Sequence, residues 1–322
     1  MVFEVLKNDS HPLKHDDAEF NVLNDVIDTL RFRGSIFFHS YLAAPWGMSL
    51  KPISTPRFHI ALEGGFFVGV SDQQVNVRPM DIVLIPNGDM HWIADEKNRE
   101  LVASEQAGKA CELGMPMFQN GEITNKIMCG VVEYDAAVNH PIFSALPSAL
   151  HLGNIHDNDS IWITVQLIDA EIRSSNSIQN SVIDRLTEVL FIKLLNRFLE
   201  ENRHLTGFFA ALREPRITKV LQLIHKYPEQ AWTLENLGEK VGMSRATLQR
   251  KFKGALATSP MTYLNHWRIA KAYNLIKYSS LSLDVIAENI GFADARTLRT
   301  AFSRHYGLTP SALRKTGRND AA

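Results

Sequence analysis

Residues 233–252 read TLENLGEKVGMSRATLQRKF, and residues 282–302 read SLDVIAENIGFADARTLRTAF. The second stretch repeats the pattern of the first 49 residues later, and one extra residue follows its central Gly. In each copy, apolar residues recur at helical spacing on both sides of that Gly. Each copy therefore predicts a helix, a sharp turn and a second helix.

The residues at the helix starts and at the turns support this prediction. A hydroxyl or carboxylate before a helix accepts free N–H groups of the first turn, and Gly adopts a positive φ at the least cost. The predicted caps of the four helices are Thr233, Ser244, Ser282 and Asp294, and the predicted turn residues are Gly242 and Gly291.

The second helix of each copy has one apolar face and one polar face. Leu248 and Phe252 share a face at i, i+4, as do Leu298 and Phe302, so we expect these residues to pack on the first helix. The opposite face should be exposed, and it carries Arg245, Ala246, Gln249, Arg250 and Lys253 in the first copy and Ala295, Arg296, Arg299, Thr300 and Arg304 in the second. Arg and Gln suit contact with base edges, and the other basic side chains suit phosphates. Two such helix-turn-helix motifs predict a DNA-binding domain.

The spacer between the motifs predicts a long helix. Ser259-Pro260 is a helix start, and the helix should run to about Lys277. Such a helix spans about 27 Å, which brings the two exposed faces close to one turn of B-DNA apart. One chain could then read two successive major grooves.

The charge distribution divides the 322-residue chain at the same region. Residues 1–205 contain 16 Lys and Arg against 27 Asp and Glu, whereas residues 206–322 contain 18 against 8. An acidic part joined to a basic part indicates that only the second part binds a polyanion. Two cysteines are too few for a disulfide framework, and no apolar run reaches the ~18 residues that a membrane span needs. Residues 1–7 have no basic region followed by an apolar stretch, so we do not expect a signal peptide. We therefore expect a cytoplasmic protein with no membrane partner.

The C-terminal part resembles the AraC/XylS family of transcription regulators. The resemblance covers residues 215–316 and rests on both helix-turn-helix motifs, on Ile290-Gly291-Phe292, and on the closing Phe302, Tyr306-Gly307 and Thr309-Pro310. It implies base contacts from Ala246, Gln249, Arg250, Ala295, Arg296 and Thr300. Ala246 can offer only a methyl contact, and Arg299 is an alternative to the short Thr300.

The N-terminal part is similar to the cupin-type sensor domain of one branch of that family. Short runs rich in β-branched and aromatic residues fill residues 35–95 and recur at 125–132, which favours a sandwich or small barrel. Segments such as Phe58–Gly64, Pro79–Pro86, His91 and Met128–Gly130 carry the likeness. The predicted fold class is thus a cupin-like β-barrel with flanking helices (residues 1–205), a linker (206–214) and an all-α double helix-turn-helix domain (215–322).

Several residues of the barrel are candidates for sensing a signal. A small barrel can enclose one small molecule, and the candidate effector-binding residues are His39, Trp46, His59, His91 and Trp92. His59 and His91 are also candidate ligands of a metal ion, although a cupin metal site usually needs a third protein ligand. Cys111 and Cys129 are candidate redox-active thiols, of which Cys111 should be the more exposed.

These observations predict an effector- or redox-controlled transcription regulator, more specifically an activator. Residues 160–202 have helical period with a broad apolar stripe, which suits packing on the barrel and on a second copy. The resemblance further implies contact with RNA polymerase. The alternative function is a metal-binding cupin enzyme fused to a DNA-binding domain, although no catalytic triad or phosphate-binding Gly motif is present.

Overall fold

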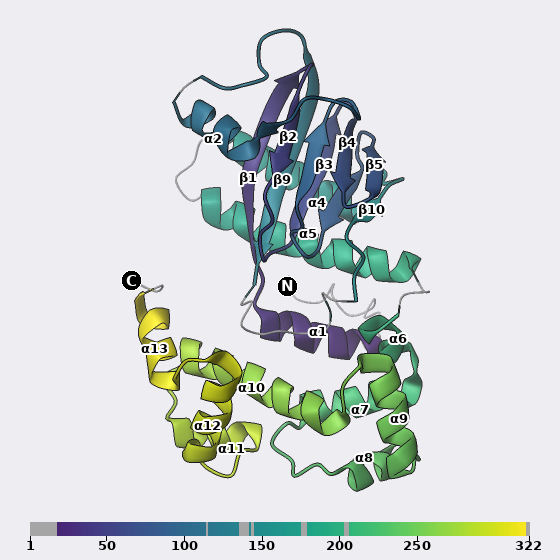
Figure 1. Ribbon diagram of the computed structural model, residues 1–322, viewed down its shortest axis with the longest axis vertical. Coiled ribbons are helices and arrows are strands. Elements are labelled where there is room, and N and C mark those ends of the chain that lie inside the picture. Colours follow the sequence, from purple (N-terminus) through teal and green to yellow (C-terminus); the bar gives the residue numbers. More distant parts are fainter. Residues whose placement is uncertain are drawn as a thin grey trace, which may run out of the picture. The chain divides into compact units, whose positions relative to one another are not determined.

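The structure is a computed structural model that describes residues 18–113, 115–134, 142, 145–174, 179–202 and 206–319 (Figure 1). Its contacts divide the chain into two compact units. Of the described residues, those between 30 and 202 form the sheet unit, and residues 206–319 form the helical unit together with residues 18–29. Residues 18–29 thus group with the helical unit by their contacts.

Two five-stranded sheets form the sheet unit among the described residues. One has the order β1 (Arg33–Ala43), β9 (Ile123–Glu133), β3 (Arg57–Glu63), β6 (Ile82–Ile85), β10 (Leu150–Leu152). The other has the order β5 (Gln73–Val77), β4 (Phe66–Val70), β7 (His91–Ala94), β2 (Gly47–Leu50), β8 (Val102–Ala103). Neighbouring strands are antiparallel, except β2 and β8, which are parallel. The strands predicted within residues 35–95 and 125–132 are confirmed.

Apolar side chains from both sheets meet in one core. Trp46, Phe66, Val83, Ile93 and Ile127 are among its members, each at most 2% exposed. Alternate residues of a strand point to opposite faces of its sheet. Strands with an alternating or fully apolar sequence therefore place apolar side chains in this core from both sheets.

A buried amide joins the strands at one edge of this core. The indole N–H of Trp46 donates to Asn125 Oδ1 at 2.9 Å, and Asn125 Nδ2 donates to the carbonyl of Gly65 at 2.8 Å. Trp46 is fully buried and Asn125 is 3% exposed, so both polar groups need these partners. Trp46 is therefore part of the barrel's framework.

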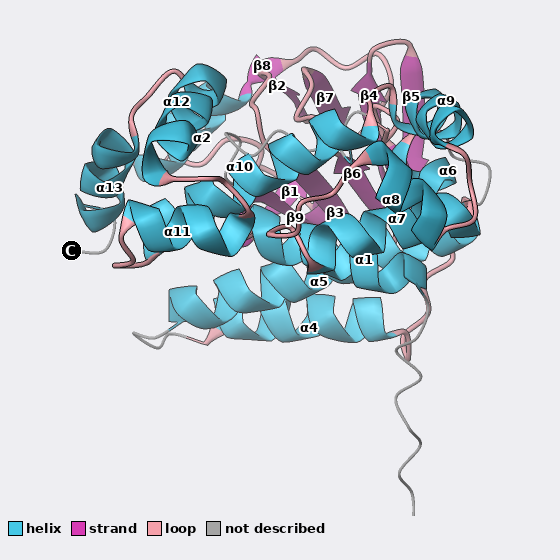
Figure 2. Ribbon diagram, turned by 90° about the horizontal axis from the view of Figure 1, so that it is seen from below, coloured by secondary structure: helices cyan, strands magenta, loops and turns pink. Residues whose placement is uncertain are grey.

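Within the described part of the sheet unit, three helices accompany the strands (Figure 2). Helix α2 (Ser104–Glu112) packs on β2 and β8. Helix α5 (Gln179–Glu201) packs on β1, β9 and β10, and α4 (Ser160–Arg173) packs on α5. The apolar stripe predicted for residues 160–202 is therefore divided between two helices.

A buried ion cluster connects α4 to the β1–β9 pair. Asp169 accepts from His39 Nε2 at 2.7 Å, from Lys126 Nζ at 2.9 Å and from Arg173 Nη2 at 2.6 Å. Burial alone would raise the pKa of Asp169, but the hydrogen bonds from Lys126 and His39 outweigh it, and the pKa is lowered. Asp169 is thus a carboxylate whose partners come from two strands and its own helix.

The helical unit contains a run of eight helices from residue 208 onward. They are α6 (Phe208–Arg213), α7 (Pro215–Lys226), α8 (Leu234–Lys240), α9 (Arg245–Leu256), α10 (Pro260–Tyr278), α11 (Leu283–Ile290), α12 (Ala295–Tyr306) and α13 (Pro310–Asn319). The segment 206–214, predicted as a linker, contains helix α6 and packs on α7 and α9. Its Phe208 and Phe209 are at most 1% exposed, so this segment contributes to the core of the helical unit.

Helix α1 (Ala18–Leu30) belongs to the helical unit except for its last residue. Asp25 lies 3.5 Å from His225 Nδ1 of α7, and Asn274 Nδ2 of α10 donates to the carbonyl of Thr29 at 2.6 Å. Val22 and Val26 are fully buried. The contacts of Asp25 and Thr29 connect α1 to α7 and α10, which are distant in sequence, and local patterns cannot predict such a pairing.

Candidate nucleic-acid interface and sensor cavity

Helices α8 and α9 form the first helix-turn-helix motif as predicted. Thr233 accepts from the N–H of Asn236, whose side chain accepts from the N–H of Thr233, and Ser244 accepts from the N–H of Thr247. Gly242 has a φ of +63°, which confirms it as the turn residue.

Gly238 is a further requirement of this motif that the sequence analysis missed. A Cβ on Gly238 would lie 2.5 Å from the carbonyl oxygen of Met243, so α8 can approach the turn only without a side chain here. A Gly inside a helical pattern is a signal of such a close approach.

Helices α11 and α12 form the second motif. Ser282 accepts from the N–H of Val285, and Asp294 accepts from the N–H of Thr297. The backbone hydrogen bond from Thr297 lowers the pKa of Asp294, which keeps the cap charged. Gly291 has a φ of +80°, and a Cβ there would meet the Arg268 side chain at 2.5 Å and the Glu229 carbonyl at 2.7 Å.

The two second helices, α9 and α12, present opposite faces to the core and to solvent. Leu248, Phe252, Leu298 and Phe302 are fully buried, as predicted. The predicted DNA-binding residues lie on the other side: all are exposed except Ala295, which is half-buried, and they are Arg245, Ala246, Gln249, Arg250, Lys253, Ala295, Arg296, Arg299, Thr300 and Arg304.

Some of these exposed side chains already have partners. Arg245 forms an ion pair with Glu235 at 2.9 Å, and the hydroxyl of Thr300 donates to the carbonyl of Arg296 at 3.0 Å. Within the described part of the chain, Arg250 has no ion pair. Its guanidinium is thus available to an outside acceptor without first breaking a bond.

The spacer helix α10 has the predicted start and nearly the predicted end. Its 19 residues correspond to about 28 Å. Arg268 on α10 donates to the carbonyls of Pro228 (2.6 Å) and Gln230 (2.7 Å), which ties the α7–α8 connection to the spacer. His225 stacks on Trp267 of the same helix with ring centroids 3.7 Å apart. These contacts hold α10 against α7 and the α7–α8 connection. The sequence patterns gave no sign of the role of Arg268.

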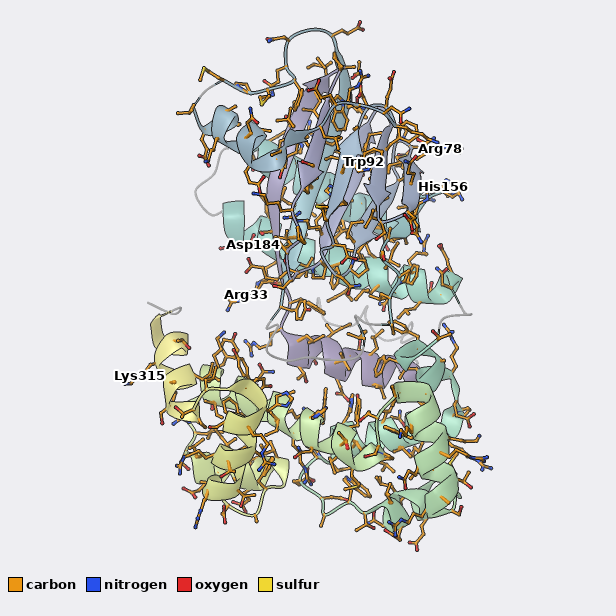
Figure 3. The ribbon with its side chains drawn as sticks, viewed as in Figure 1. Arg33, Arg78, Trp92, His156, Asp184 and Lys315 are labelled. Atoms are coloured by element: carbon orange, nitrogen blue, oxygen red, sulfur yellow. The ribbon has the colours of Figure 1, made fainter. Side chains whose placement is uncertain are left out.

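The five candidate effector-binding residues do not form one site. His39 binds Asp169, and Trp46 lies in the core. Trp92 packs against Gly69, where a Cβ would come within 2.5 Å of three indole atoms (Figure 3). Only His59 and His91 are brought together.

These two histidines form a buried hydrogen-bonded chain with Cys129. His59 Nδ1 lies 2.9 Å from Cys129 Sγ, His59 Nε2 lies 2.8 Å from His91 Nε2, and His91 Nδ1 lies 2.7 Å from the carbonyl of Asp89. A carbonyl only accepts, so His91 Nδ1 donates to Asp89 and His91 Nε2 accepts from His59. His59 Nδ1 is then an acceptor, and the thiol of Cys129 donates to it.

The protonation states follow from burial. Burial lowers the pKa of His91 to about 4 and that of His59 well below its ordinary value, and each is at most 2% exposed. Burial raises the pKa of Cys129, so its thiol stays protonated. Cys129 is buried and Cys111 is exposed, as the sequence predicted.

The chain of hydrogen bonds does not fit a metal site. A metal ion needs the nitrogen lone pairs, and here both ring nitrogens of His59 and both of His91 are engaged. No group of three or more His, Cys, Asp or Glu side chains suited to a metal occurs among the residues that the structure describes. Among the described residues, His59 and His91 thus have no third ligand of the kind that cupin metal centres use.

A cavity of about 260 Å³ lies in the sheet unit beside Cys129. Strand residues Phe38, Met48, Leu50, Arg57, Ile93 and Cys129 line it together with Ser104, Glu105, Ala107 and Gly108 of α2. None of His39, Trp46, His59, His91 and Trp92 is among them. Trp46 belongs to the core, and His59 and His91 are buried beside Cys129, whereas the cavity lies where α2 covers the strands.

The cupin family model matches residues 21–200, and a helix-turn-helix domain model matches residues 237–316. The chain belongs to the AraC family of transcriptional regulators with an N-terminal cupin domain. It is therefore a DNA-binding transcriptional regulator, with a β-sheet cupin region followed by an all-helical DNA-binding domain.

Similar proteins extend over nearly the whole chain. The regulator AlkR of Acinetobacter baylyi is 24% identical over 92% of this chain and 99% of its own length. MtrA of Neisseria gonorrhoeae is 25% identical with the same coverages, and the activator RclR of Escherichia coli, named as specific for RCS, is 22% identical over 88% and 93%. These AraC-family relatives are transcriptional regulators and not enzymes.

Among solved structures, the DNA-binding domain of AdpA in complex with a target DNA is 30% identical, with a TM-score of 0.31, and covers 33% of this chain and 95% of that chain. Within the described residues, no helix has the length and apolar character to cross a membrane.

The buried state of His91 predicts a pH dependence of stability. His91 has a pKa of about 4 in the folded chain and an ordinary value near 6.5 when unfolded, so the unfolded chain binds more protons between these values. Neutral, buried His91 therefore contributes fully to the free energy of unfolding above pH 6.5. This contribution is lost as the pH falls from 6.5 toward 4. The difference in unfolding free energy between wild type and His91→Gln should narrow by roughly 2–3 kcal/mol from pH 7.5 to 4.5.

Denaturant unfolding at a series of pH values measures this difference. The exposed His156 (Figure 3) provides the control variant His156→Gln, whose curve should keep the wild-type shape. A His91→Gln curve parallel to wild type would contradict the neutral, buried assignment of His91.

Proposed function

We propose that this protein is a sequence-specific transcriptional activator that a small effector controls through the cupin domain. The observation that carries the proposal is the pair of capped helices, α9 and α12, whose basic faces are exposed while their apolar faces are buried. This arrangement is the one in which helix-turn-helix proteins place a reading helix in the major groove.

Individual roles follow from side-chain chemistry. Arg250 and Gln249 on α9 suit bidentate contact with guanine and adenine edges, and Ala246 suits a thymine methyl. On α12, Arg296 and Arg299 are the matching readers, because the Thr300 hydroxyl already donates to its own helix. Lys253 and Arg304 suit phosphates, as do the remaining exposed basic residues.

The contacts of Cys129 favour a bound effector over thiol oxidation as the signal. The thiolate is the reactive form of a cysteine, and Cys129 is a protonated donor to His59 with a raised pKa. Cys111 is exposed on α2, but no His or Cys side chain of the described residues forms a hydrogen bond with it. The cavity, in contrast, is a preformed space for a ligand.

Control would operate as a population shift. An effector that binds one arrangement of the cupin domain better than another changes how often the DNA-binding domain engages its site. Activation then requires contact of the DNA-bound protein with RNA polymerase. Transcription in vitro with purified polymerase tests this step, and lower transcript yield on adding the protein would indicate a repressor.

We also propose a homodimer through α4 and α5. Ile163 and Leu167 on α4 share a face at i, i+4 and are 45% and 50% exposed, and Val182 and Val189 on α5 are 38% and 44% exposed. Leu190, Leu194 and Phe198 of α5 are buried within the unit, so the apolar side chains left exposed are the ones available to a second copy.

The base-reading assignment predicts different effects of two neighbouring substitutions. Arg250→Ala should relax base preference at one position, at a cost of about 1–3 kcal/mol for the preferred sequence. Lys253→Ala should weaken binding to all sequences alike and make the salt dependence of the affinity less steep. Fluorescence anisotropy with a set of single-base operator variants at several salt concentrations measures both effects.

The exposed Arg78, which follows β5 in the sheet unit, supplies the control Arg78→Ala, which should bind as wild type does. Equal losses across all sequences for both α9 variants would show that α9 is not the reading helix.

The dimer proposal predicts that Leu167→Glu shifts the protein toward a monomer, because a charge would be buried in the interface. Sedimentation velocity at micromolar concentration measures the mass. Leu113→Glu, at a residue 71% exposed after α2, is the control and should leave the mass unchanged. A wild type that sediments as a monomer would rule the proposal out.

A further inference from the structure

The cavity beneath α2 has apolar walls. Phe38, Met48, Leu50, Ile93 and Ala107 supply most of its lining, and the protonated thiol of Cys129 behaves as a small apolar group. Its volume of about 260 Å³ is at the lower end of ligand sites, which indicates a small ligand with an apolar body.

Two charged side chains, Arg57 and Glu105, line the same cavity. Glu105 is exposed, and its carboxylate forms an ion pair with Lys51 at 3.2 Å. Its own backbone N–H and Lys51 lower the pKa of Glu105. The negative charge at the cavity is therefore already compensated.

The positive charge of Arg57, on β3, has no comparable ion-pair partner among the described residues. Nη1 donates to the carbonyl of Lys51 at 2.8 Å, and the buried Nε has no hydrogen-bond partner in the part of the chain that the structure describes. No described carboxylate lies within ion-pair distance of the guanidinium. Burial lowers the pKa of Arg57, which reflects the cost of keeping a cation in this place.

A guanidinium has five N–H donors in a planar fork, and a carboxylate matches two of them at once. An incompletely bonded cation beside an apolar space is stabilised by an anion that carries its own apolar body. A single negative charge is sufficient, because Arg57 is the one basic residue among the described residues that line the cavity.

We propose that this cavity binds a small monocarboxylate with an apolar body, and that Arg57 binds its carboxylate. The inference rests on the proposed function in that it names the chemical class of the effector. It assigns the ligand to residues of β3 and α2, none of which the sequence analysis chose.

Isothermal titration calorimetry on the full chain tests the proposal with two matched series: benzoate, benzyl alcohol and benzylamine, and hexanoate, hexanol and hexylamine. We expect at least one carboxylate to bind at one molecule per chain, and the alcohol and amine of the same body to bind at least about tenfold more weakly. If the amine of a series bound more tightly than the carboxylate, Glu105 would be the residue that recognises the ligand's charge, and the proposal would be overturned. So would the absence of carboxylate binding at millimolar concentration.

Variants locate the site. Arg57→Gln should weaken carboxylate binding about tenfold or more, whereas Arg57→Lys should retain part of the affinity. Arg185→Gln, at a residue exposed on α5, is the control and should bind as wild type does. Unchanged affinity in a folded Arg57→Gln would overturn the proposal.

A second variant covers the case in which Arg57→Gln does not fold. A Cβ on Gly108 would meet no atom within 4 Å, so the backbone has room for a side chain there. Gly108→Leu therefore adds an apolar side chain at a residue of the cavity lining and leaves all charges in place. We expect it to weaken carboxylate binding as well, and unchanged binding would place the ligand elsewhere.

DNA binding on the same preparations separates this inference from the proposed function. Specific DNA binding with no carboxylate binding would overturn the inference and leave the regulator intact. Carboxylate binding to Arg57 without specific DNA binding would overturn the proposed function and support the site.

Discussion

The burial of one apolar face on each second helix is the constraint on which the DNA-binding surface depends. Leu248 and Phe252 on α9, and Leu298 and Phe302 on α12, are fully buried. A helix with one face held in the core has its opposite face in solvent, and in both helices that face is basic. The caps Ser244 and Asp294 and the positive φ of Gly242 and Gly291 set where each helix begins, which determines the residues on the exposed face.

The sequence was most informative about the helical unit, since its structure is largely local. Caps, Gly turns and i, i+4 pairs act within a few residues, and each predicted cap and turn residue is found in place. Contacts between distant segments were not predictable in this way. The contacts of α1 join Asp25 to His225 and Thr29 to Asn274, residues 200 and 245 positions apart. Helix α6 has only six residues, which is too short for a helical period to show in the sequence.

In the barrel, too, contacts between segments distant in sequence could not be predicted. Alternating apolar patterns predicted its strands, but they do not distinguish a side chain that lines a cavity from one that fills a core. Trp46 and His39 are the chemically conspicuous residues, and both are committed to internal hydrogen bonds with Asn125 and Asp169. The cavity depends on how α2 covers β2 and β8, which is a matter of tertiary packing. Arg57 gave no sequence signal, since an Arg at the start of a strand is ordinarily a solvated side chain.

The most direct test of the central claim, that one chain reads two successive major grooves through α9 and α12, is selection of bound DNA from a random-sequence pool with the full chain. The account predicts a consensus with two short blocks whose centres are about 10–10.5 base pairs apart. A consensus with a single block, or enrichment without any consensus, would contradict it.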